Sequence, residues 1–350
     1  MSLTLITGAP GWLGNRLVEV LIKGLPDVPK LAQPDPSRRI RCLALPGTDV
    51  SPLRALSSNI EIIVGDLRDT TALTEFSRGG EGATLFHCAG VIHPTRGVQE
   101  FFEVNVEGTR KLLQTAESVG VARLVAVSSN SPIGTNPSRN HLFDETSPYN
   151  PYMGYGRSKM MLEQAVQEYQ ERGRLQTVII RPPWFYGPHQ PPRQTLFFKM
   201  IKNGQAPIVG DGENRRSMAY VDNICQGLLL CERVSAANGQ IYWIADRRPY
   251  TSNEIVDTVE RLLEKEFGIA VAHRRLRLPS ITSEIALLAD RILQGFGLYH
   301  QKIHVLSEMN KDIACSIVKA QKELDYNPVI ELEEGMRRSI AWLLEKGHQI

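Results

Sequence analysis

A tyrosine and a lysine placed four positions apart, Tyr155 and Lys159, form the pattern in this chain with the clearest chemical meaning. They lie in the run NPYMGYGRSK, whose surroundings are typical of a helix. Four residues make about one helical turn, so the phenol and the ammonium project from the same face. A cation beside a phenol favours the phenolate and lowers its pKa, which makes the phenol a proton donor and acceptor near neutral pH. Alone, the pair is a weak signal, because the same spacing arises by chance on many surface helices.

A glycine-rich turn near the N-terminus supplies a second chemical pattern. Leu3 to Thr7 has the composition of a short buried strand, and the segment TGAPGWLG leads from it into residues 16–22, which have helical periodicity. A tight turn, close approach of backbone to a pyrophosphate and close helix packing each exclude a β-carbon, and a helix N-terminus supplies amide donors. The spacing of Gly8, Gly11 and Gly14 therefore predicts a dinucleotide site, with a plain glycine turn as the alternative.

The end of the second predicted strand, residues 39–45, does not specify the type of dinucleotide. A proline-rich stretch, residues 24–37, precedes this strand and is predicted to be a surface loop. An acidic residue at the strand end would bind the ribose of NAD, and an arginine would bind the 2′-phosphate of NADP. The chain has Leu45-Pro46-Gly47 there, which is neither signal. Nearby, Asp49 would favour NAD, whereas Arg38, Arg39 and Arg41 would favour NADP. We expect NAD or NADP, with a slight preference for NAD.

Further predicted strands alternate with helices up to residue 181. They comprise residues 60–64, 83–88, 122–128 and 177–181. This alternation predicts an α/β protein with a doubly wound parallel sheet, whose ligands bind beyond the carboxyl ends of the strands. We expect residues 1–181 to form a dinucleotide-binding domain and residues 182–350 a smaller α+β cap that supplies the substrate pocket. A strand is predicted from Gln240 to Ile244, and it either belongs to the cap or rejoins the main sheet.

Composition narrows the class of protein. The net charge of +2 and the short basic clusters do not indicate a nucleic-acid partner. The five cysteines lack C-x-x-C spacing, which predicts reduced, buried thiols and a cytoplasmic protein, and no metal site is expected. No signal peptide is recognisable and no membrane span is predicted, because the longest apolar stretch, residues 281–298, carries charged side chains. That stretch fits a packed amphipathic helix better than a helix on a membrane surface.

Together these motifs resemble the extended short-chain dehydrogenases/reductases. That family includes nucleotide-sugar epimerases and dehydratases, 3β-hydroxysteroid dehydrogenases and dihydroflavonol reductases. The resemblance covers nearly the whole chain and rests on TGAPGWLG, GDLRD, HCAG, NVEGT, VSSNSPIG, YGRSK, RPPWFYGP and RRSMAYVDN, in this order. It implies a Rossmann fold, an NAD(P) cofactor and a homodimer joined through helices near residues 97–119 and 151–171.

The resemblance also implies residue roles. Tyr155 would be the acid/base on the substrate oxygen, and Lys159 would lower its pKa and bind the nicotinamide ribose. Ser129 would hydrogen-bond the reacting oxygen, and Asn105 would belong to a proton relay. Besides Tyr155 and Lys159, the cofactor contacts would be Gly8, Gly11, Trp12, Leu13, Gly14, Asp66, Leu67, Ala89, Gly90 and Pro182. Asp66 has a second interpretation, as a helix N-cap shared with Asp69. The expected substrate contacts are Asn130, Trp184 and Arg216.

Two enzymatic functions fit this pattern. The first is a dehydrogenase or reductase of a secondary alcohol or ketone in a small or apolar substrate, favoured by the apolar cap. The second is a nucleoside-diphosphate-sugar epimerase with tightly bound NAD, in which Arg216 with Arg275 or Arg277 would bind the diphosphate. A 4,6-dehydratase is disfavoured, because Asn130-Ser131 stand where that enzyme has an Asp-Glu pair. A non-catalytic dinucleotide-binding sensor is a remote alternative. The substrate and the reaction direction are not specified by the sequence.

Overall fold

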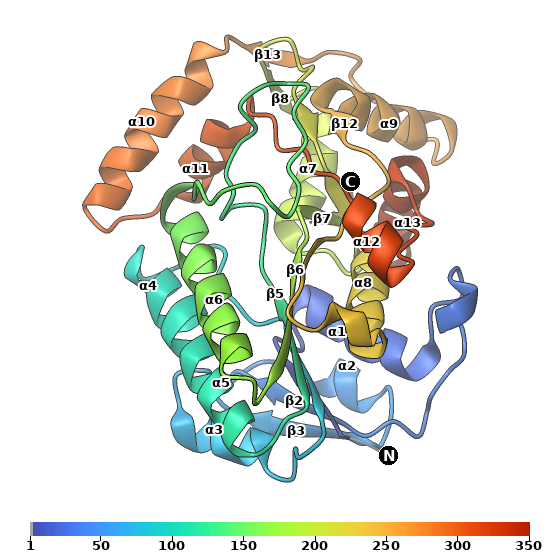
Figure 1. Cartoon of the computed structure of the whole chain (residues 1–350). Coiled ribbons are helices and arrows are strands. Elements are labelled where there is room, and N and C mark those ends of the chain that lie inside the picture. The colour runs from blue at the N-terminus through green and yellow to red at the C-terminus, as the bar shows by residue number, and fades with distance from the viewer. Residues whose placement is uncertain (1–2) are drawn as a thin grey trace.

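Seven parallel strands form the main sheet of the computed structural model, which describes residues 3–350 (Figure 1). The strand order is β11-β6-β5-β4-β1-β2-β3. The bounds are β1 Thr4–Thr7, β2 Ile40–Ala44, β3 Ile60–Val64, β4 Thr84–His87, β5 Arg123–Val127, β6 Gln176–Arg181 and β11 Ile241–Trp243. The central strands β1 and β5 are buried along their whole length, as is typical of a parallel sheet covered on both faces. The predicted doubly wound parallel sheet is confirmed.

Helices cover both faces of this sheet, and successive strand residues point into different cores. Ile6 packs with α1 and α8 on one face, whereas Leu5 packs with α3, α5 and α6 on the other. The helix bounds are α1 Trp12–Lys23, α2 Ser51–Arg54, α3 Thr70–Ser77, α4 Gln99–Phe102, α5 Thr109–Ser118, α6 Met153–Glu171 and α8 Val221–Arg233. The proline-rich stretch is a loop except for one 3-10 turn, Pro29–Leu31, whose Leu31 is buried.

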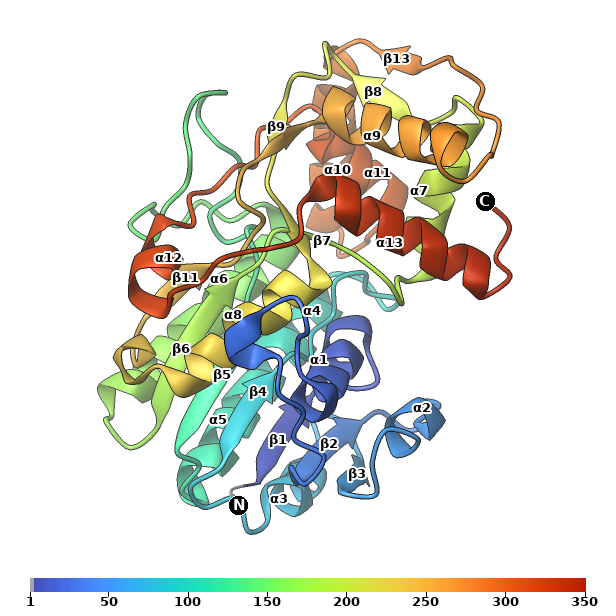
Figure 2. The same ribbon diagram turned by 90° about the vertical axis from the view of Figure 1, so that its right-hand side faces the viewer.

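The cap lies above the carboxyl ends of the strands (Figure 2). It contains three short strand pairs and a core of its own. The strands are β7 Trp184–Tyr186, β8 Pro207–Val209, β9 Arg215–Arg216, β10 Met218–Tyr220, β12 Tyr250–Thr251 and β13 Leu276–Leu278. The helices of the cap are α7 Pro192–Lys202, α9 Ser252–Lys265, α10 Ile281–Gly295, α11 Gln301–Glu308 and α13 Leu332–Glu345, whereas α12 Val318–Leu324 packs with the main sheet.

The second half of the chain returns to the main sheet. Helix α8 packs on one face, and β11 pairs with the edge strand β6 in the register Ile241↔Ile179. Helix α12 packs against both α8 and β11. The segment predicted from Gln240 to Ile244 is therefore part of the main sheet.

Helix α10 contradicts the expectation of a packed apolar face. Its buried residues are Ser283, Ala286 and Asp290, whereas most of its large apolar side chains are exposed. The packed side makes polar contacts, and these fix the rotation of the helix about its axis. Within the described residues 3–350, no helix is both long enough and apolar enough to cross a membrane.

Candidate active site

Tyr155 and Lys159 lie in the first two turns of α6, as predicted. Glycines let this helix approach the loop after β5 closely, because a β-carbon at Gly156 would lie 2.5 Å from the backbone oxygen of Ser131. Tyr155 is half-buried, and its ring centre lies 5.7 Å from that of Phe101 in α4. The small residues on α6 thus bring the phenol to the carboxyl end of β5, where Ser129 follows.

Lys159 is only 4% exposed. Its ammonium donates a hydrogen bond of 3.0 Å to the backbone oxygen of Val127, the last residue of β5. Burial lowers the pKa of Lys159 to about 8, against the opposing effect of the Glu163 carboxylate. The ammonium is therefore held at the sheet edge in an environment that eases its deprotonation.

The expected lowering of the Tyr155 pKa by Lys159 is not found. Burial raises the pKa of Tyr155 to about 12, and a hydrogen bond with Ser129 opposes this rise. The Lys159 ammonium is directed at the Val127 oxygen instead, so desolvation dominates the pKa of the phenol. The pair does share one face of the helix, but the groups that favour the phenolate are Ser129 and the Arg193 cation.

Ser129 is buried directly after β5. Its hydroxyl accepts a 3.3 Å hydrogen bond from the backbone nitrogen of Ser131 and reaches the side-chain oxygen of Asn130 at 3.4 Å. The structure therefore brings together Ser129, Asn130 and Tyr155. Their convergence matches the arrangement expected of a hydroxyl pair that contacts one substrate oxygen.

Asn105 lies in a π-helical segment, Glu103–Gly108, that the sequence did not reveal. Its side-chain oxygen accepts from the Val91 nitrogen at 2.7 Å, and its side-chain nitrogen donates to the Val91 oxygen at 2.9 Å. The same nitrogen also donates to Ser158 Oγ at 3.1 Å, so both of its hydrogens are used. Asn105 thereby fixes the loop after β4, and a proton relay through it, which stays a prediction, must use its oxygen.

The turn between β1 and α1 has no room for a β-carbon at Gly8 or at Gly11. Gly8 has a φ of 84°, and a β-carbon there would lie 2.6 Å from the backbone nitrogen of Ala89. A β-carbon at Gly11 would lie 2.7 Å from the backbone oxygen of Gly8. Gly11 is the N-cap of α1 and supplies no side-chain cap, which leaves the first amides of the helix open to a ligand. These features fit the pyrophosphate of a dinucleotide.

The loop after β4 lies at the same edge of the sheet as the glycine turn. A β-carbon at Gly90 would meet Lys159 Nζ at 3.1 Å and Asn105 Oδ1 at 3.3 Å. The ammonium and the amide oxygen therefore flank the position where only glycine fits. This places the catalytic candidates beside Ala89 and Gly90, at the same edge as the glycine turn.

Other predicted cofactor contacts take part in defined interactions. Trp12 donates from Nε1 to the Pro188 oxygen at 2.7 Å, which ties the glycine turn to the cap. The Asp66 carboxylate is paired with Arg68 at 2.7 Å, and Asp69 is the N-cap of α3. The cap interpretation of Asp66 is therefore wrong, and its contact with adenine stays a prediction. Leu13 and Leu67 are buried, and Pro182 follows β6.

The arginines near the start of β2 bind partners far from the carboxyl end of this strand. Arg38 donates to Thr4 Oγ1 at 2.9 Å, and Arg41 pairs with Glu61 of β3 at 2.6 Å. Both lie at the start of β2, opposite the carboxyl end at which the cofactor edge lies. Asp49, for its part, accepts from the backbone nitrogen of Ser51.

The other predicted substrate contacts, Trp184 and Arg216, lie in the cap. Trp184 in β7 is half-buried and packs edge-on against Phe197, with ring centres 5.7 Å apart. Arg216 in β9 donates to the backbone oxygen of Glu308 and has no carboxylate partner within residues 3–350. Arg275 is paired with Asp257 and with Glu260, so its expected availability for a diphosphate is not found.

Sequence reasoning missed a line of rings and polar groups between the cap and Tyr155. The Tyr299 ring lies 5.6 Å from that of Phe101 and 5.5 Å from that of His304. His93 Nδ1 is 2.8 Å from the Tyr299 hydroxyl, and His304 Nδ1 is 2.7 Å from the buried Asp290 carboxylate. The signal in the sequence was Asp290, an acidic residue within the apolar run of residues 281–298.

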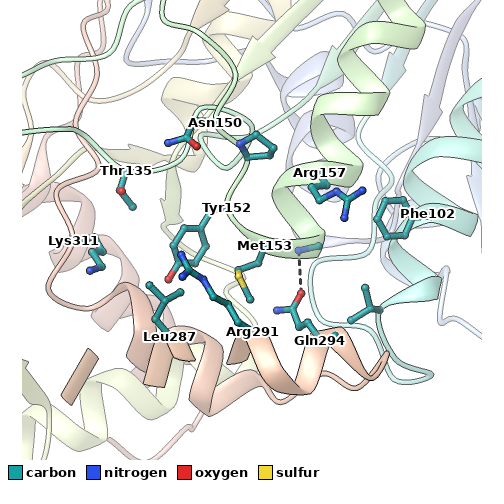
Figure 3. A pocket seen from close by; sticks show the side chains of 14 residues that line it. Phe102, Thr135, Asn150, Tyr152, Met153, Arg157, Leu287, Arg291, Gln294 and Lys311 are labelled. Atoms are coloured by element: carbon teal, nitrogen blue, oxygen red, sulfur yellow. Dashed lines mark hydrogen bonds between the residues drawn. The ribbon is translucent and has the colours of Figure 1, made fainter. Parts of the chain in front are cut away.

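A separate pocket of about 520 Å³ opens between the start of α6 and α10 (Figure 3). Its lining includes Arg157, Arg291 and Lys311 but none of Ser129, Tyr155 and Lys159. This pocket is therefore distinct from the group of catalytic candidates.

Comparisons with known proteins agree with this geometry. The NAD dependent epimerase/dehydratase family matches residues 4–245. The chain is 51% identical over 346 residues to an uncharacterized protein, y4nL, of Sinorhizobium fredii, which covers 99% of this chain and 96% of that protein. It is 27% identical over 346 residues to 3beta-hydroxysteroid-dehydrogenase/decarboxylase isoform 1 of Arabidopsis thaliana, with 96% and 78% covered.

Among solved structures, DesIV (dTDP-glucose 4,6-dehydratase) from Streptomyces venezuelae with NAD and TYD bound superimposes with a TM-score of 0.75. Its identity to this chain is 26%, with 99% of this chain and 97% of that chain covered. The fold and the site define an enzyme of the extended short-chain dehydrogenase type that uses a nicotinamide dinucleotide. The chain belongs to the NAD dependent epimerase/dehydratase family.

Proposed function

We propose that this protein is an NAD(P)-dependent oxidoreductase that transfers hydride between nicotinamide and a secondary alcohol or ketone of a small or apolar substrate. The observation that carries the proposal is the convergence of Ser129 and Tyr155 beside the buried Lys159 ammonium. All three lie at the carboxyl edge of the sheet, next to the loop that contains Gly90.

Each side chain has a defined task in this reaction. The Ser129 hydroxyl donates to the substrate oxygen and holds it against Tyr155. The Tyr155 hydroxyl takes the proton from the alcohol or returns it to the ketone. Lys159 binds the nicotinamide ribose at the same edge of the sheet. The nicotinamide, when bound, accepts or donates the hydride.

The glycine turn, the open amides of α1 and the Ala89-Gly90 loop would hold the dinucleotide. We favour NAD over NADP, because Arg38 and Arg41 are committed to Thr4 and Glu61 at the far end of β2. We also expect a cytoplasmic homodimer formed through α5 and α6, and sedimentation of the purified protein measures its mass.

The alternative is a nucleoside-diphosphate-sugar epimerase. Arg216 supports it, because this half-buried cation has no carboxylate partner within residues 3–350. The engagement of Arg275 with two carboxylates removes one of the two expected partners for a diphosphate. For this reason we prefer the dehydrogenase.

Cofactor exchange and turnover separate the two functions. A dehydrogenase reduces added NAD with apolar secondary alcohols, and Tyr155→Phe slows this turnover by roughly 10²- to 10⁴-fold without loss of NAD binding. Tyr169→Phe, near the end of the same helix, is the matched control and keeps full activity. Tightly co-purified NAD, no exchange with added NAD and a melting temperature raised by UDP would establish the epimerase instead. Full turnover of Tyr155→Phe would revive the non-catalytic sensor.

A further inference from the structure

Helix α10 carries most of its large apolar side chains on the exposed side. Four of them and the C-cap residue Phe296 form a row, with exposed fractions between 54% and 81%: Ile281, Ile285, Leu288, Ile292 and Phe296. Their spacing of three and four residues confines the row to about 80° of the helix circumference. Leu298, which is 57% exposed, extends the row beyond the helix end. This apolar row is a continuous surface, unlike single apolar side chains scattered over a protein.

Polar contacts on the opposite side hold the row outward. The Asp290 carboxylate accepts from Gln294 at 3.0 Å and is 2.7 Å from His304 Nδ1 of α11. Gln294 in turn accepts from the Gly154 nitrogen of α6 at 3.0 Å, and Ser283 Oγ donates to the Leu306 oxygen at 2.8 Å. Rotating α10 to bury the row would break these bonds, so the exposure of the row is built into the fold.

Cations lie along one flank of the row. Arg291 of α10 and Arg157 of α6 line the pocket between these helices, and no acidic side chain lines it (Figure 3). Within residues 3–350, neither arginine has a hydrogen bond or an ion pair. Lys311, at the same pocket, is paired with Glu284, the acidic residue on that flank of α10. The pocket therefore offers an anion two guanidinium groups that have no hydrogen-bonded carboxylate.

We propose that α10 is a membrane-docking helix, whose apolar row enters the surface of a bilayer while Arg157 and Arg291 bind the headgroups of anionic lipids. A helix of 15 residues lying flat would present about 22 Å of apolar edge to the acyl chains. A second copy of the chain fits less well, because Glu284 is already paired with Lys311 and α10 has no free exposed carboxylate to meet the arginines. The inference does not depend on the substrate of the enzyme.

Flotation of the full chain with lipid vesicles tests the proposal. We expect the protein to float with vesicles of equimolar phosphatidylglycerol and phosphatidylcholine, and much less with phosphatidylcholine alone. The variant Leu288→Ser/Ile292→Ser should lose at least about tenfold in binding. The matched control Val318→Ser/Leu344→Ser, which alters side chains that are 48% and 37% exposed elsewhere, should bind like the original protein.

The charge contribution is tested separately. Each arginine near an anionic surface is expected to contribute about fivefold to binding, so Arg157→Gln/Arg291→Gln should lose roughly 25-fold on the anionic vesicles. Raising the salt concentration should also weaken binding of the original protein to the anionic vesicles. The variants Leu288→Ser/Ile292→Ser and Arg157→Gln/Arg291→Gln both change exposed side chains, so their melting temperatures should stay unchanged.

Three results would overturn the proposal. One is unchanged flotation of Leu288→Ser/Ile292→Ser, and another is equal binding to anionic and neutral vesicles. The third is a failure of the original protein to bind any vesicle. If Leu288→Ser/Ile292→Ser then also has a smaller mass in sedimentation, the apolar row contacts a second copy of the chain.

Discussion

The carboxylate of Glu163 accepts two hydrogen bonds from the guanidinium of Arg181, at 3.0 Å from Nε and 2.7 Å from Nη2. Both side chains are at most 2% exposed. Glu163 also accepts from Ser128 Oγ at 2.5 Å and from the Tyr149 hydroxyl at 2.8 Å. Since Glu163 lies one turn after Lys159, this group of bonds ties the catalytic helix to β5 and β6.

Replacing Glu163 by glutamine should destabilise the protein by roughly 3–5 kcal/mol, because it leaves the buried Arg181 cation without a carboxylate. Urea denaturation measures the free energy of unfolding. Glu168→Gln is the matched control on the same helix, since Glu168 pairs with Arg110 and Arg172 in solvent, and its effect should be far smaller. Equal losses in the two variants would contradict the importance of the buried pair.

Gly8 is expected to tolerate no side chain. Gly8→Ala places a β-carbon 2.6 Å from the Ala89 nitrogen at a φ of 84°, so the turn must move and NAD affinity should fall at least about tenfold. Gly79→Ala is the control: it has a positive φ of 67° but nothing within 4 Å of the new carbon. It should cost only about 1–2 kcal/mol of stability from the left-handed backbone. Titration of NAD by protein fluorescence, with urea denaturation, separates the two effects.

Asn105→Ala should affect the loop after β4. The backbone nitrogen and oxygen of Val91 lose their partner, which should cost about 1–3 kcal/mol of stability. If the amide only positions the loop, NAD affinity and turnover should fall together, and Asn105→Asp should recover part of both. A selective loss of turnover with normal NAD affinity would favour the proton relay.

Local patterns predicted much of the sheet. Residues 60–64 and 177–181 were predicted as strands and correspond to β3 and β6. The apolar run of β6 is buried, as is typical of a strand covered on both faces, whereas β3 lies at the sheet edge and is partly exposed. The spacing also predicted that Tyr155 and Lys159 share one helix face and that the glycine turn joins a strand to a helix. These features depend on neighbours in sequence, so the sequence contains them.

Features set by tertiary packing were not predictable in this way. The periodicity of α10 gives the same pattern whether its apolar side is packed or exposed, and the contacts of Asp290 with distant His304 decide the outcome. The pKa of Tyr155 depends on its burial and on where the Lys159 ammonium points. The π-helical turn at Asn105 arises with bonds to Val91 and Ser158 that no local pattern encodes.

Two buried groups are expected to oppose each other in the pH dependence of stability. Burial lowers the pKa of His87 to about 3 from its ordinary 6.5, while its two nitrogens lie 2.7 and 2.8 Å from the hydroxyls of Thr7 and Thr109. Burial raises the pKa of Asp246 to about 7 from its ordinary 3.8, against hydrogen bonds from Tyr186, Tyr220 and Asn223.

The signs follow from proton binding. Between about pH 4 and pH 6.5, unfolding lets His87 bind a proton, so its contribution to stability falls as the pH falls toward 3. Over the same range, unfolding makes Asp246 release a proton, so its contribution falls as the pH rises toward 7. Each slope is about 1.4 kcal/mol per pH unit, and the two nearly cancel.

Single substitutions should therefore reveal opposite slopes. His87→Gln removes the His87 contribution, so relative to the original protein its free energy of unfolding should fall as the pH is raised from about 4 to 6.5. Asp246→Asn removes the Asp246 contribution, so relative to the original protein its free energy of unfolding should rise over the same range. Urea denaturation at several pH values measures both slopes, and His348→Gln, at the exposed C-terminal end, is the control that should match the original protein. Parallel slopes in the two core variants would show that these groups do not titrate as their burial requires.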